Sequence, residues 1–200
     1  MIKALIFDLD GTLIHTTPEY RYLIVRATLQ KLNAKDVPNS AIDKFWWGPY
    51  RNNIIKTQLN IKPEDFWPTL QTTADLALRK LHIKAYDDVH ILRNLRSQGL
   101  KTAIVSGAPK DAVECELELI NHKFDAIITG TNVHPNHKPD PLGLHLCVQE
   151  LQIKPSEAMY IGNADEDILM AENAGMQSII VDRKEHTLEL QPKVLINSLT

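Results

Sequence analysis

Two aspartates, Asp8 and Asp10, directly follow a largely apolar run at residues 2–7. A short apolar run is typical of a buried strand, and Gly11 marks the turn that ends it. Both carboxylates therefore stand at a strand end, where the crevice of an open α/β sheet binds its ligands. Two acids this close repel one another and favour a bound cation, and hard oxygen ligands suit Mg²⁺. Taken alone, these residues also fit an Asp-Gly turn without chemical consequence.

The second half of the chain alternates between strand and helix patterns. Apolar runs predict buried strands at residues 100–105, 126–129, 158–161 and 178–181. Helical spacing of apolar residues lies between them, at residues 110–121, 141–151 and 166–174. Such alternation gives parallel strands joined by crossover helices. The sequence therefore predicts an α/β fold with a doubly wound parallel sheet, to which residues 2–8 add a fifth strand.

Residues 17–84 break this alternation, because they contain no convincing strand pattern. They predict a series of helices at residues 18–32, 40–45, 50–59 and 63–81. A helix predicted at residues 87–98 then returns to the main pattern. We therefore expect an α/β core domain formed by residues 1–16 and 85–200, with residues 17–84 inserted as a helical domain.

The composition is that of an ordinary globular protein, with 44% hydrophobic and 24% charged residues. A net charge of −3 provides no basic field for holding nucleic acid. The apolar stretches are too short to span a bilayer, and the acidic motif near the start is unlike a signal peptide. We expect a cytoplasmic protein with no nucleic-acid or membrane partner, and a monomer, with a dimer as the alternative.

Three further features follow in chain order, each placed at a predicted strand end. In the first, Ser106 precedes Gly107, Ala108 and a helix start. A hydroxyl, small residues that permit close approach and a helix N-terminus together form an anion site. A Ser-Gly turn of purely structural role is the alternative. The second feature is Lys138, directly before a proline.

The third of these features is an acid-rich segment after the strand predicted at residues 158–161. It begins with Asn163 and continues to Asp165 and Asp167. An asparagine offers Mg²⁺ a carbonyl oxygen without formal charge, so metal binding should be weaker than with a carboxylate. Alternatively, some of these acids only stabilise the N-terminus of a helix.

The order of the four features resembles the four motifs of the haloacid dehalogenase superfamily, in the branch of phosphoglycolate phosphatases and β-phosphoglucomutases. The Asp-x-Asp-Gly-Thr sequence is similar to that family's nucleophile motif. The resemblance implies that Asp8 is the nucleophile and that Asp10 is the general acid and base. It also implies that Ser106 binds the phosphate and that Lys138 neutralises the transferring group. Gly107 and Ala108 would complete the phosphate site.

The resemblance also implies a Mg²⁺ site formed by Asp8, Asp10, Asn163 and Asp167. Asp10 would contribute its backbone carbonyl. The family pattern at the fourth motif is Gly-Asp-x-x-x-Asp, so Asn163 stands where the family has an aspartate. Asp165 is a candidate to fill that vacancy through a shifted loop.

By the same resemblance, residues 17–84 form a mobile helical cap over the active site. A Gly-centred segment at residues 46–51 resembles the substrate loop of such caps. Arg51 would then reach a second anionic or polar group of the substrate. Trp47 would shield the site or stack on the substrate, with packing between cap helices as the alternative.

The expected function is a Mg²⁺-dependent phosphatase that hydrolyses a small phosphorylated metabolite through an aspartyl-phosphate intermediate. Two alternatives stay open: a phosphomutase of the same superfamily, and a non-catalytic ligand-binding or interaction protein with a degraded metal site. Tyr20 aligns with the linker histidine of mutases and thus favours hydrolysis. Asp10 argues against dehalogenation, in which no leaving alcohol needs a proton.

Overall fold

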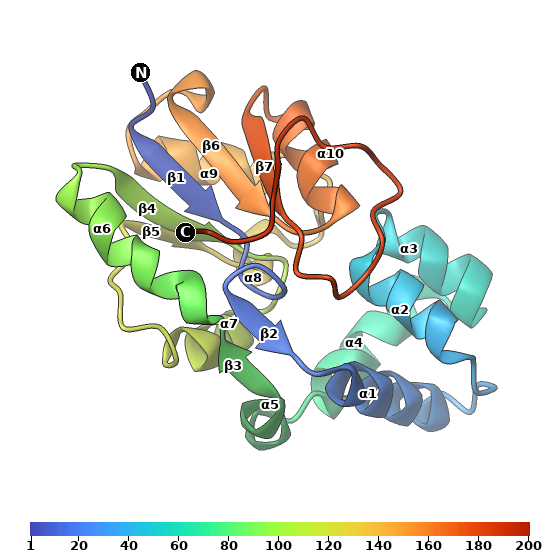
Figure 1. The fold of residues 1–200 in the computed structure, drawn as a ribbon. Coiled ribbons are helices and arrows are strands. Elements are labelled where there is room, and N and C mark those ends of the chain that lie inside the picture. The colour runs from blue at the N-terminus through green and yellow to red at the C-terminus, as the bar shows by residue number, and fades with distance from the viewer. The chain divides into compact units, whose positions relative to one another are not determined.

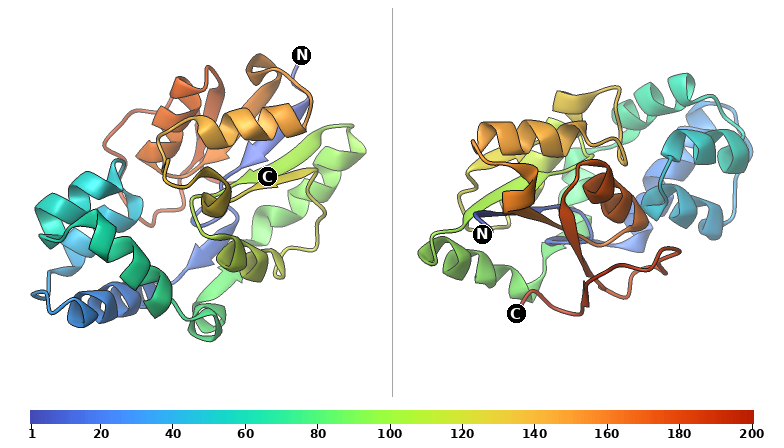
Figure 2. Two further views of the ribbon diagram at one scale, coloured as in Figure 1. Left: turned by 180° about the vertical axis from the view of Figure 1, so that it is seen from behind. Right: turned by 90° about the horizontal axis from the view of Figure 1, so that it is seen from above.

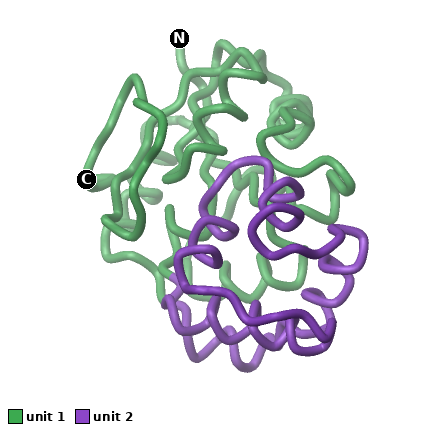
Figure 3. Tube along the Cα trace, turned by 90° about the vertical axis from the view of Figure 1, so that its right-hand side faces the viewer, with its two compact units in different colours: residues 1–15, 84–200 green, residues 16–83 purple.

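The computed structural model describes all residues, 1–200, and the chain divides into two compact units (Figure 3). One unit contains residues 1–15 and 84–200, and the other contains residues 16–83. The predicted domain boundaries differ from these units by one residue at each end. That the second unit serves as a cap stays a prediction.

The first unit is built on a six-stranded sheet (Figure 1). Its strands, in order across the sheet, are β5 (Ala126–Ile128), β4 (Lys101–Val105), β1 (Ala4–Phe7), β6 (Ala158–Gly162), β7 (Gln177–Val181) and β8 (Leu195–Ile196). All neighbouring strands are parallel. The predicted doubly wound parallel sheet is therefore confirmed. The short edge strand β8 was not predicted.

Strand β1 lies at the point where the chain reverses its direction across the sheet. The chain places β4 and β5 on one side of β1, and then returns to place β6, β7 and β8 on the other. In this register Ile6 lies between Ala103 of β4 and Tyr160 of β6. Such a reversal opens a crevice at the carboxyl ends of the strands. The residues that directly follow β1, β4 and β6 therefore lie next to one another.

Helices cover both faces of this sheet (Figures 1 and 2). They are α6 (Ile91–Ser97), α7 (Lys110–Leu117), α8 (Gly130–Val133), α9 (Leu142–Glu150) and α10 (Asp165–Asn173), with 3₁₀ turns at Asp87–His90 and Pro155–Glu157. Apolar residues of α9 and α10 share one core cluster with β1, β4, β5 and β6. Helix α6 lies on the opposite face and contacts β4. Helix α8 was not predicted.

The second unit is helical and has a core of its own. It consists of α1 (Pro18–Lys31), α2 (Asn39–Trp47), α3 (Arg51–Ile54), a π-helical turn (Ile55–Leu59), α4 (Pro63–Thr73) and α5 (Leu76–His82). Pro18 and Pro63 stand at the first turns of α1 and α4, where a missing N–H costs nothing. Phe45 and Phe66 pack edge to face in this core, with ring centroids 5.1 Å apart.

The predicted single helix over residues 63–81 was wrong, because the structure contains two helices there. Helix α4 ends at Thr73 and α5 begins at Leu76. Between them, the Asp75 carboxylate accepts a hydrogen bond of 2.9 Å from the Leu78 N–H and so caps α5. An aspartate in this position competes with the continuing helix and starts a new one.

A two-stranded ribbon carries the chain from one unit to the other and back. It consists of β2 (Ile14–Thr16) and β3 (Ile83–Ala85). At one end the Tyr86 N–H donates to the Leu13 carbonyl, and at the other the Thr17 N–H donates to the His82 carbonyl. The strands are therefore antiparallel, and the sequence did not predict them. None of the chain's helices combines the length and apolar character needed to cross a membrane.

Leu144 provides a test of the core that supports the sheet. Its side chain on α9 is fully buried in the cluster beneath β1 and β4. Leu144→Ala should lower the free energy of unfolding by about 2–5 kcal/mol, because it leaves a cavity. Leu119→Ala is the control, because Leu119 is 44% exposed. Equal denaturant midpoints for the two variants would contradict this placement of the core.

Candidate active site

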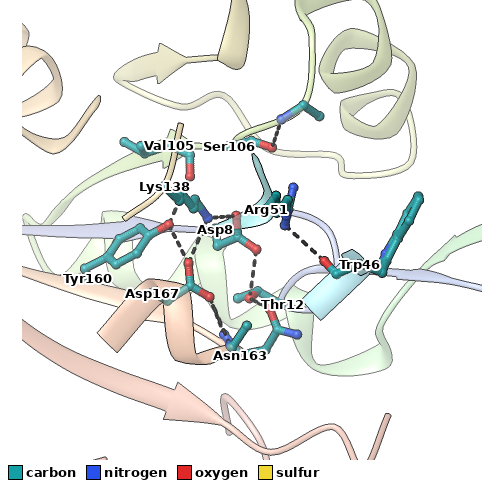
Figure 4. A network of polar contacts seen from close by, with 12 residues as sticks. Asp8, Thr12, Trp46, Arg51, Val105, Ser106, Lys138, Tyr160, Asn163 and Asp167 are labelled. Atoms are coloured by element: carbon teal, nitrogen blue, oxygen red, sulfur yellow. Dashed lines mark hydrogen bonds and ion pairs between the residues drawn. The ribbon is translucent and has the colours of Figure 1, made fainter. Parts of the chain in front are cut away.

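The Lys138 side chain lies between two buried carboxylates at the carboxyl end of the sheet (Figure 4). Its ammonium lies 2.5 Å from Asp8 Oδ1 and 2.7 Å from Asp167 Oδ1. The Tyr160 hydroxyl lies 3.1 Å from Asp167 Oδ1 and 3.1 Å from the Val105 carbonyl. All of these side chains are buried, so each charge has its compensating charge within the protein rather than in solvent.

Burial raises the pKa of the Asp8 carboxyl to about 6, although the Lys138 ammonium pulls it down. Burial alone would lower the pKa of Lys138, but Asp167 and Asp8 outweigh this effect and hold it well above its usual value. Burial would raise the pKa of Asp167, but Lys138 and two backbone N–H groups keep it below its usual value. The network therefore contains one ammonium and two carboxylates at neutral pH.

The turn after β1 brings Thr12 back against Asp8. The Thr12 hydroxyl lies 3.4 Å from Asp8 Oδ2 and 3.1 Å from Asn163 Oδ1. Gly11 has a φ of 83°, which favours glycine, and its N–H donates to the Ile14 carbonyl. This tight turn keeps Asp10 near Asp8. The charge of Asp10 therefore adds to the rise in the pKa of Asp8.

Asp167 and Asp165 at the start of α10 have different contacts. Asp167 Oδ2 accepts hydrogen bonds of 3.0 Å from the N–H groups of Asn163 and Ala164. Because Lys138 and Tyr160 face its other oxygen, both Asp167 oxygens have protein donors, which disfavours the direct Mg²⁺ contact that the resemblance implies for Asp167. The Asp165 carboxylate instead accepts from the N–H groups at residues 189 and 190. Both of its oxygens are therefore engaged away from Asp8.

The oxygen atoms that face Thr12 fit a hard cation. Asp8 Oδ2 and Asn163 Oδ1 are buried and share the single hydroxyl of Thr12, so each retains lone pairs for another partner. Carboxylate, amide carbonyl and backbone carbonyl oxygens are the ligands that Mg²⁺ accepts. No group of three or more His, Cys, Asp and Glu side chains with ligand spacing is present. The donor set therefore fits Mg²⁺, with less charge than a set of three carboxylates.

Ser106 follows β4, beside Asp8, as its place in the sequence predicted. Its Oγ accepts a hydrogen bond of 3.2 Å from the Ala108 N–H, so its own proton stays available to a ligand. Ser106, Gly107 and Lys138 line one small pocket. Gly130 lies tightly against this loop, and its N–H donates to the Ala108 carbonyl over 2.7 Å.

The predicted position of Lys138 at a strand end was wrong. Strand β5 ends at Ile128, and Lys138 lies in the loop between α8 and α9. The loop is long enough to return the side chain to Asp8, so the pairing arises although the local structure differs. Two contributors to the network, Tyr160 and Thr12, had no assigned role. The sequence indicated Tyr160 only as a residue of a predicted strand, and Thr12 only as part of the Asp-x-Asp-Gly-Thr motif.

Arg51 and Trp47 belong to the helical unit. Arg51 begins α3, and its Nη2 donates to the Trp46 carbonyl over 3.0 Å. Trp47 ends α2, and the guanidinium of Arg21 lies 5.6 Å from its ring centroid. The contact with Arg21 favours a packing role for Trp47 within its own unit.

The chain belongs to the haloacid dehalogenase-like hydrolase family, whose model matches residues 5–181. It is 30% identical over 186 residues to pyrophosphatase PpaX of Bacillus cereus, covering 90% of this chain and 83% of the relative. It is 29% identical over 199 residues to a phosphoglycolate phosphatase of Vibrio cholerae, covering 88% of this chain and 83% of that one. The resemblance that the motifs indicated is therefore confirmed.

The fold also matches a solved structure from Bacteroides fragilis, which is named as a haloacid dehalogenase-like hydrolase. The TM-score is 0.85 at 23% sequence identity, and the match covers 100% of this chain and 98% of the other. At this identity the likeness concerns the fold.

Gly162 provides a test of how tightly the site is packed. A Cβ at this position would lie 2.5 Å from Asp167 Cβ, and the Asp167 side chain is held by several hydrogen bonds. Gly162→Ala should therefore lower the free energy of unfolding by about 1–3 kcal/mol. Gly107→Ala is the matched control, because a Cβ there meets nothing within 4 Å. Equal thermal midpoints for the two variants would show that the Asp167 side chain can move aside without loss of stability.

Proposed function

We propose that this protein is a Mg²⁺-dependent phosphatase that hydrolyses a small phosphomonoester through an aspartyl-phosphate on Asp8. The observation that carries the proposal is the Lys138 ammonium, bound to Asp8 at the edge where β1, β4 and β6 end. An ionised carboxylate beside a fixed positive charge suits attack on a phosphoryl group. The names of the relatives, a pyrophosphatase and a phosphoglycolate phosphatase, support this class of reaction.

In the first step an Asp8 oxygen attacks phosphorus while the bond to the leaving oxygen breaks. Asp10 donates its proton to that oxygen, and an alcohol departs. In the second step Asp10 takes a proton from water, and the resulting hydroxide attacks the aspartyl-phosphate. Phosphate leaves, and the Asp8 carboxylate is restored. Throughout, Lys138 and the Ser106 hydroxyl bind the phosphoryl oxygens and stabilise their charge.

Bound Mg²⁺ would add positive charge next to the transferring group. Asp8, the Asp10 backbone carbonyl and Asn163 Oδ1 are the residues that would hold it. Asp167 supports this arrangement from behind, since its carboxylate binds Lys138 and the N–H of Asn163. A change of charge at residues that hydrogen-bond to metal ligands strongly changes the affinity for the metal.

Hydrolysis is favoured over phosphoryl transfer between substrate hydroxyls by the contacts of two residues. His15 is the histidine near the linker, and its Nδ1 pairs with the Glu185 carboxylate. Tyr20, which aligns with the mutase histidine, lies in α1 with the Arg79 guanidinium 5.2 Å from its ring centroid. Tyr20 thus supplies no imidazole at the position of the mutase histidine, and the Glu185 carboxylate holds the His15 ring by its Nδ1. A non-catalytic ligand-binding role is the alternative, and a lack of Mg²⁺-dependent phosphate release would favour it.

The substrate is expected to carry a second anionic or polar group that Arg51 contacts. A panel for testing this should contain phosphorylated small acids, sugar phosphates and pyrophosphate, in view of the relatives' names. A substrate role for Trp47 has less support, because its ring packs against Arg21. The cytoplasmic location and the monomeric state stay predictions.

Asp8→Asn should abolish phosphate release, because the amide cannot attack phosphorus. Asp10→Asn should still form the aspartyl-phosphate from an aryl phosphate, seen as a burst of released nitrophenolate, and should lose this step with an alkyl phosphate, because a nitrophenolate leaves without a proton. Phosphate release should be measured with Mg²⁺ present, on 4-nitrophenyl phosphate and on a panel of alkyl phosphates. Appreciable turnover by a clean Asp8→Asn preparation would remove Asp8 from the role of nucleophile.

Asn163→Asp should tighten Mg²⁺ binding roughly 10-fold or more, because it adds a carboxylate beside Asp8. The wild-type protein should accordingly need a high Mg²⁺ concentration for half-maximal activity. Mg²⁺ affinity is measured directly by titration calorimetry, and independently from the metal dependence of turnover.

Asp165→Asn is the matched control for the metal titration, since Asp165 already accepts two backbone N–H groups. We expect it to leave Mg²⁺ affinity within about twofold of wild type, well below the effects of changes at metal sites. If Asp165→Asn weakened binding and Asn163→Asp did not change it, Asp165 would be the ligand. If neither variant changed binding, the proposed metal site would be wrong.

A further inference from the structure

The segment after β7 carries charged side chains that the proposed chemistry does not use. Arg183 is nearly buried, with its side chain 8% exposed. Its Nη1 and Nη2 donate to the two oxygens of Asp88 over 2.7 and 3.0 Å. Nη2 also donates to the Thr12 carbonyl over 2.6 Å. One guanidinium thus ties the turn after β1 to the start of the 3₁₀ turn at residues 87–90.

Asp88 is itself fixed by the end of the chain. Besides Arg183, it accepts hydrogen bonds of 3.1 Å from the Ser198 hydroxyl and 2.9 Å from the Leu199 N–H. The Arg183 guanidinium further lies over the Tyr86 ring, 3.9 Å from its centroid. Because Asp88 and Tyr86 restrain the Arg183 guanidinium, the group that donates to the Thr12 carbonyl has little freedom to move.

Glu185, two residues further on, contacts His15 of β2 and Tyr86, which directly follows β3. Its Oε1 pairs with His15 Nδ1, at the end of residues 1–15, and accepts the Tyr86 hydroxyl, shortly after the chain re-enters the unit. Arg183 and Glu185 therefore act on one continuous stretch, from Thr12 to His15, at its beginning and at its end.

Thr12 joins this stretch to the active site. Its carbonyl faces Arg183, while its hydroxyl faces Asp8 and Asn163. Asp10 lies two residues before Thr12 in the same tight turn. A turn that is anchored at Thr12 has little freedom to move Asp10, because its internal hydrogen bonds leave few dihedral angles unrestrained.

We propose that Arg183 is a positioning residue that holds the turn carrying Asp10 and Thr12 in its reactive arrangement, with Glu185 fixing the far end of the same stretch. The proposal rests on the proposed function, in which Asp10 moves the proton of the leaving group. In this role Arg183 acts through the Thr12 carbonyl rather than by contact with the substrate. Loss of Arg183 should therefore slow a substrate more, the more its leaving group needs a proton from Asp10.

Arg183→Ala should lower the single-turnover rate of aspartyl-phosphate formation by roughly 10- to 100-fold for alkyl phosphates and by less than about threefold for 4-nitrophenyl phosphate, because in that step only the alkyl leaving group needs a proton from Asp10. KM should change little. Arg183→Lys should recover only part of the loss, since an ammonium cannot serve Asp88 with two bonds and Thr12 with a third. Equal losses on both kinds of substrate, or full recovery with lysine, would overturn the proposal.

Arg96→Ala is the matched control. Arg96 also donates to a backbone carbonyl, that of Lys123, and pairs with a carboxylate, that of Asp125. It lies in α6 and has no contact with the turn at residues 9–14. Its removal should leave the ratio of alkyl to aryl rates of aspartyl-phosphate formation unchanged. If Arg183→Ala does not fold, Asp88→Asn provides a milder test, because it weakens the same anchor. Its rate loss should again be larger for alkyl than for aryl phosphates, with a smaller difference between them.

Hydrogen exchange tests the anchor without any turnover. In Arg183→Ala, amides of residues 9–15 should exchange faster than in the wild type, while those of β5 keep their rates. Arg96→Ala should leave residues 9–15 unchanged. If the wild type does not hydrolyse phosphate esters, the proposed function fails and the exchange result still decides the positioning role. Unchanged exchange at residues 9–15 in Arg183→Ala would refute it.

Discussion

The ammonium of Lys138 compensates two carboxylates that the parallel sheet brings together in a buried place. Asp8 and Asp167 come from the ends of different elements, and neither has solvent to stabilise its charge. Removing one member of such a group leaves an uncompensated buried charge, which costs far more than the net gain from the pair. The strand order, the loop before α9 and the first turn of α10 are therefore all tied to the position of one side chain.

Asp167 restrains the position of the Lys138 side chain. Its carboxylate is fixed by the backbone of Asn163 and Ala164, so Lys138 meets an acceptor that cannot move. The close contact between Gly162 and Asp167 adds a steric restraint to the electrostatic one. Asp167 and Gly162 thus restrain the Lys138 ammonium from behind, and through it the Asp8 carboxylate, so the network is organised before a ligand arrives.

The sequence predicted the parts of this arrangement that depend on local pattern. Alternating apolar runs and helices determine a parallel sheet, and motifs after the strands follow from it. The pattern did not reveal β8 or the break at Asp75, because a two-residue strand has no period and a cap competes with a helix by a single hydrogen bond. The contact between Thr12 and Asn163 and the partners of Asp165 were equally hidden, since these residues lie more than twenty positions apart in the chain.

The paired ends of the helical unit have a consequence for how such a protein diversifies. The chain leaves the core at residue 16 and returns at residue 84, and Thr17 is hydrogen-bonded to His82. An insert whose ends meet adds little loop-closure entropy to the host, whatever its length. The Lys138 network is built wholly from residues outside the insert. The inserted helices can therefore be exchanged without replacing any residue of the charged network.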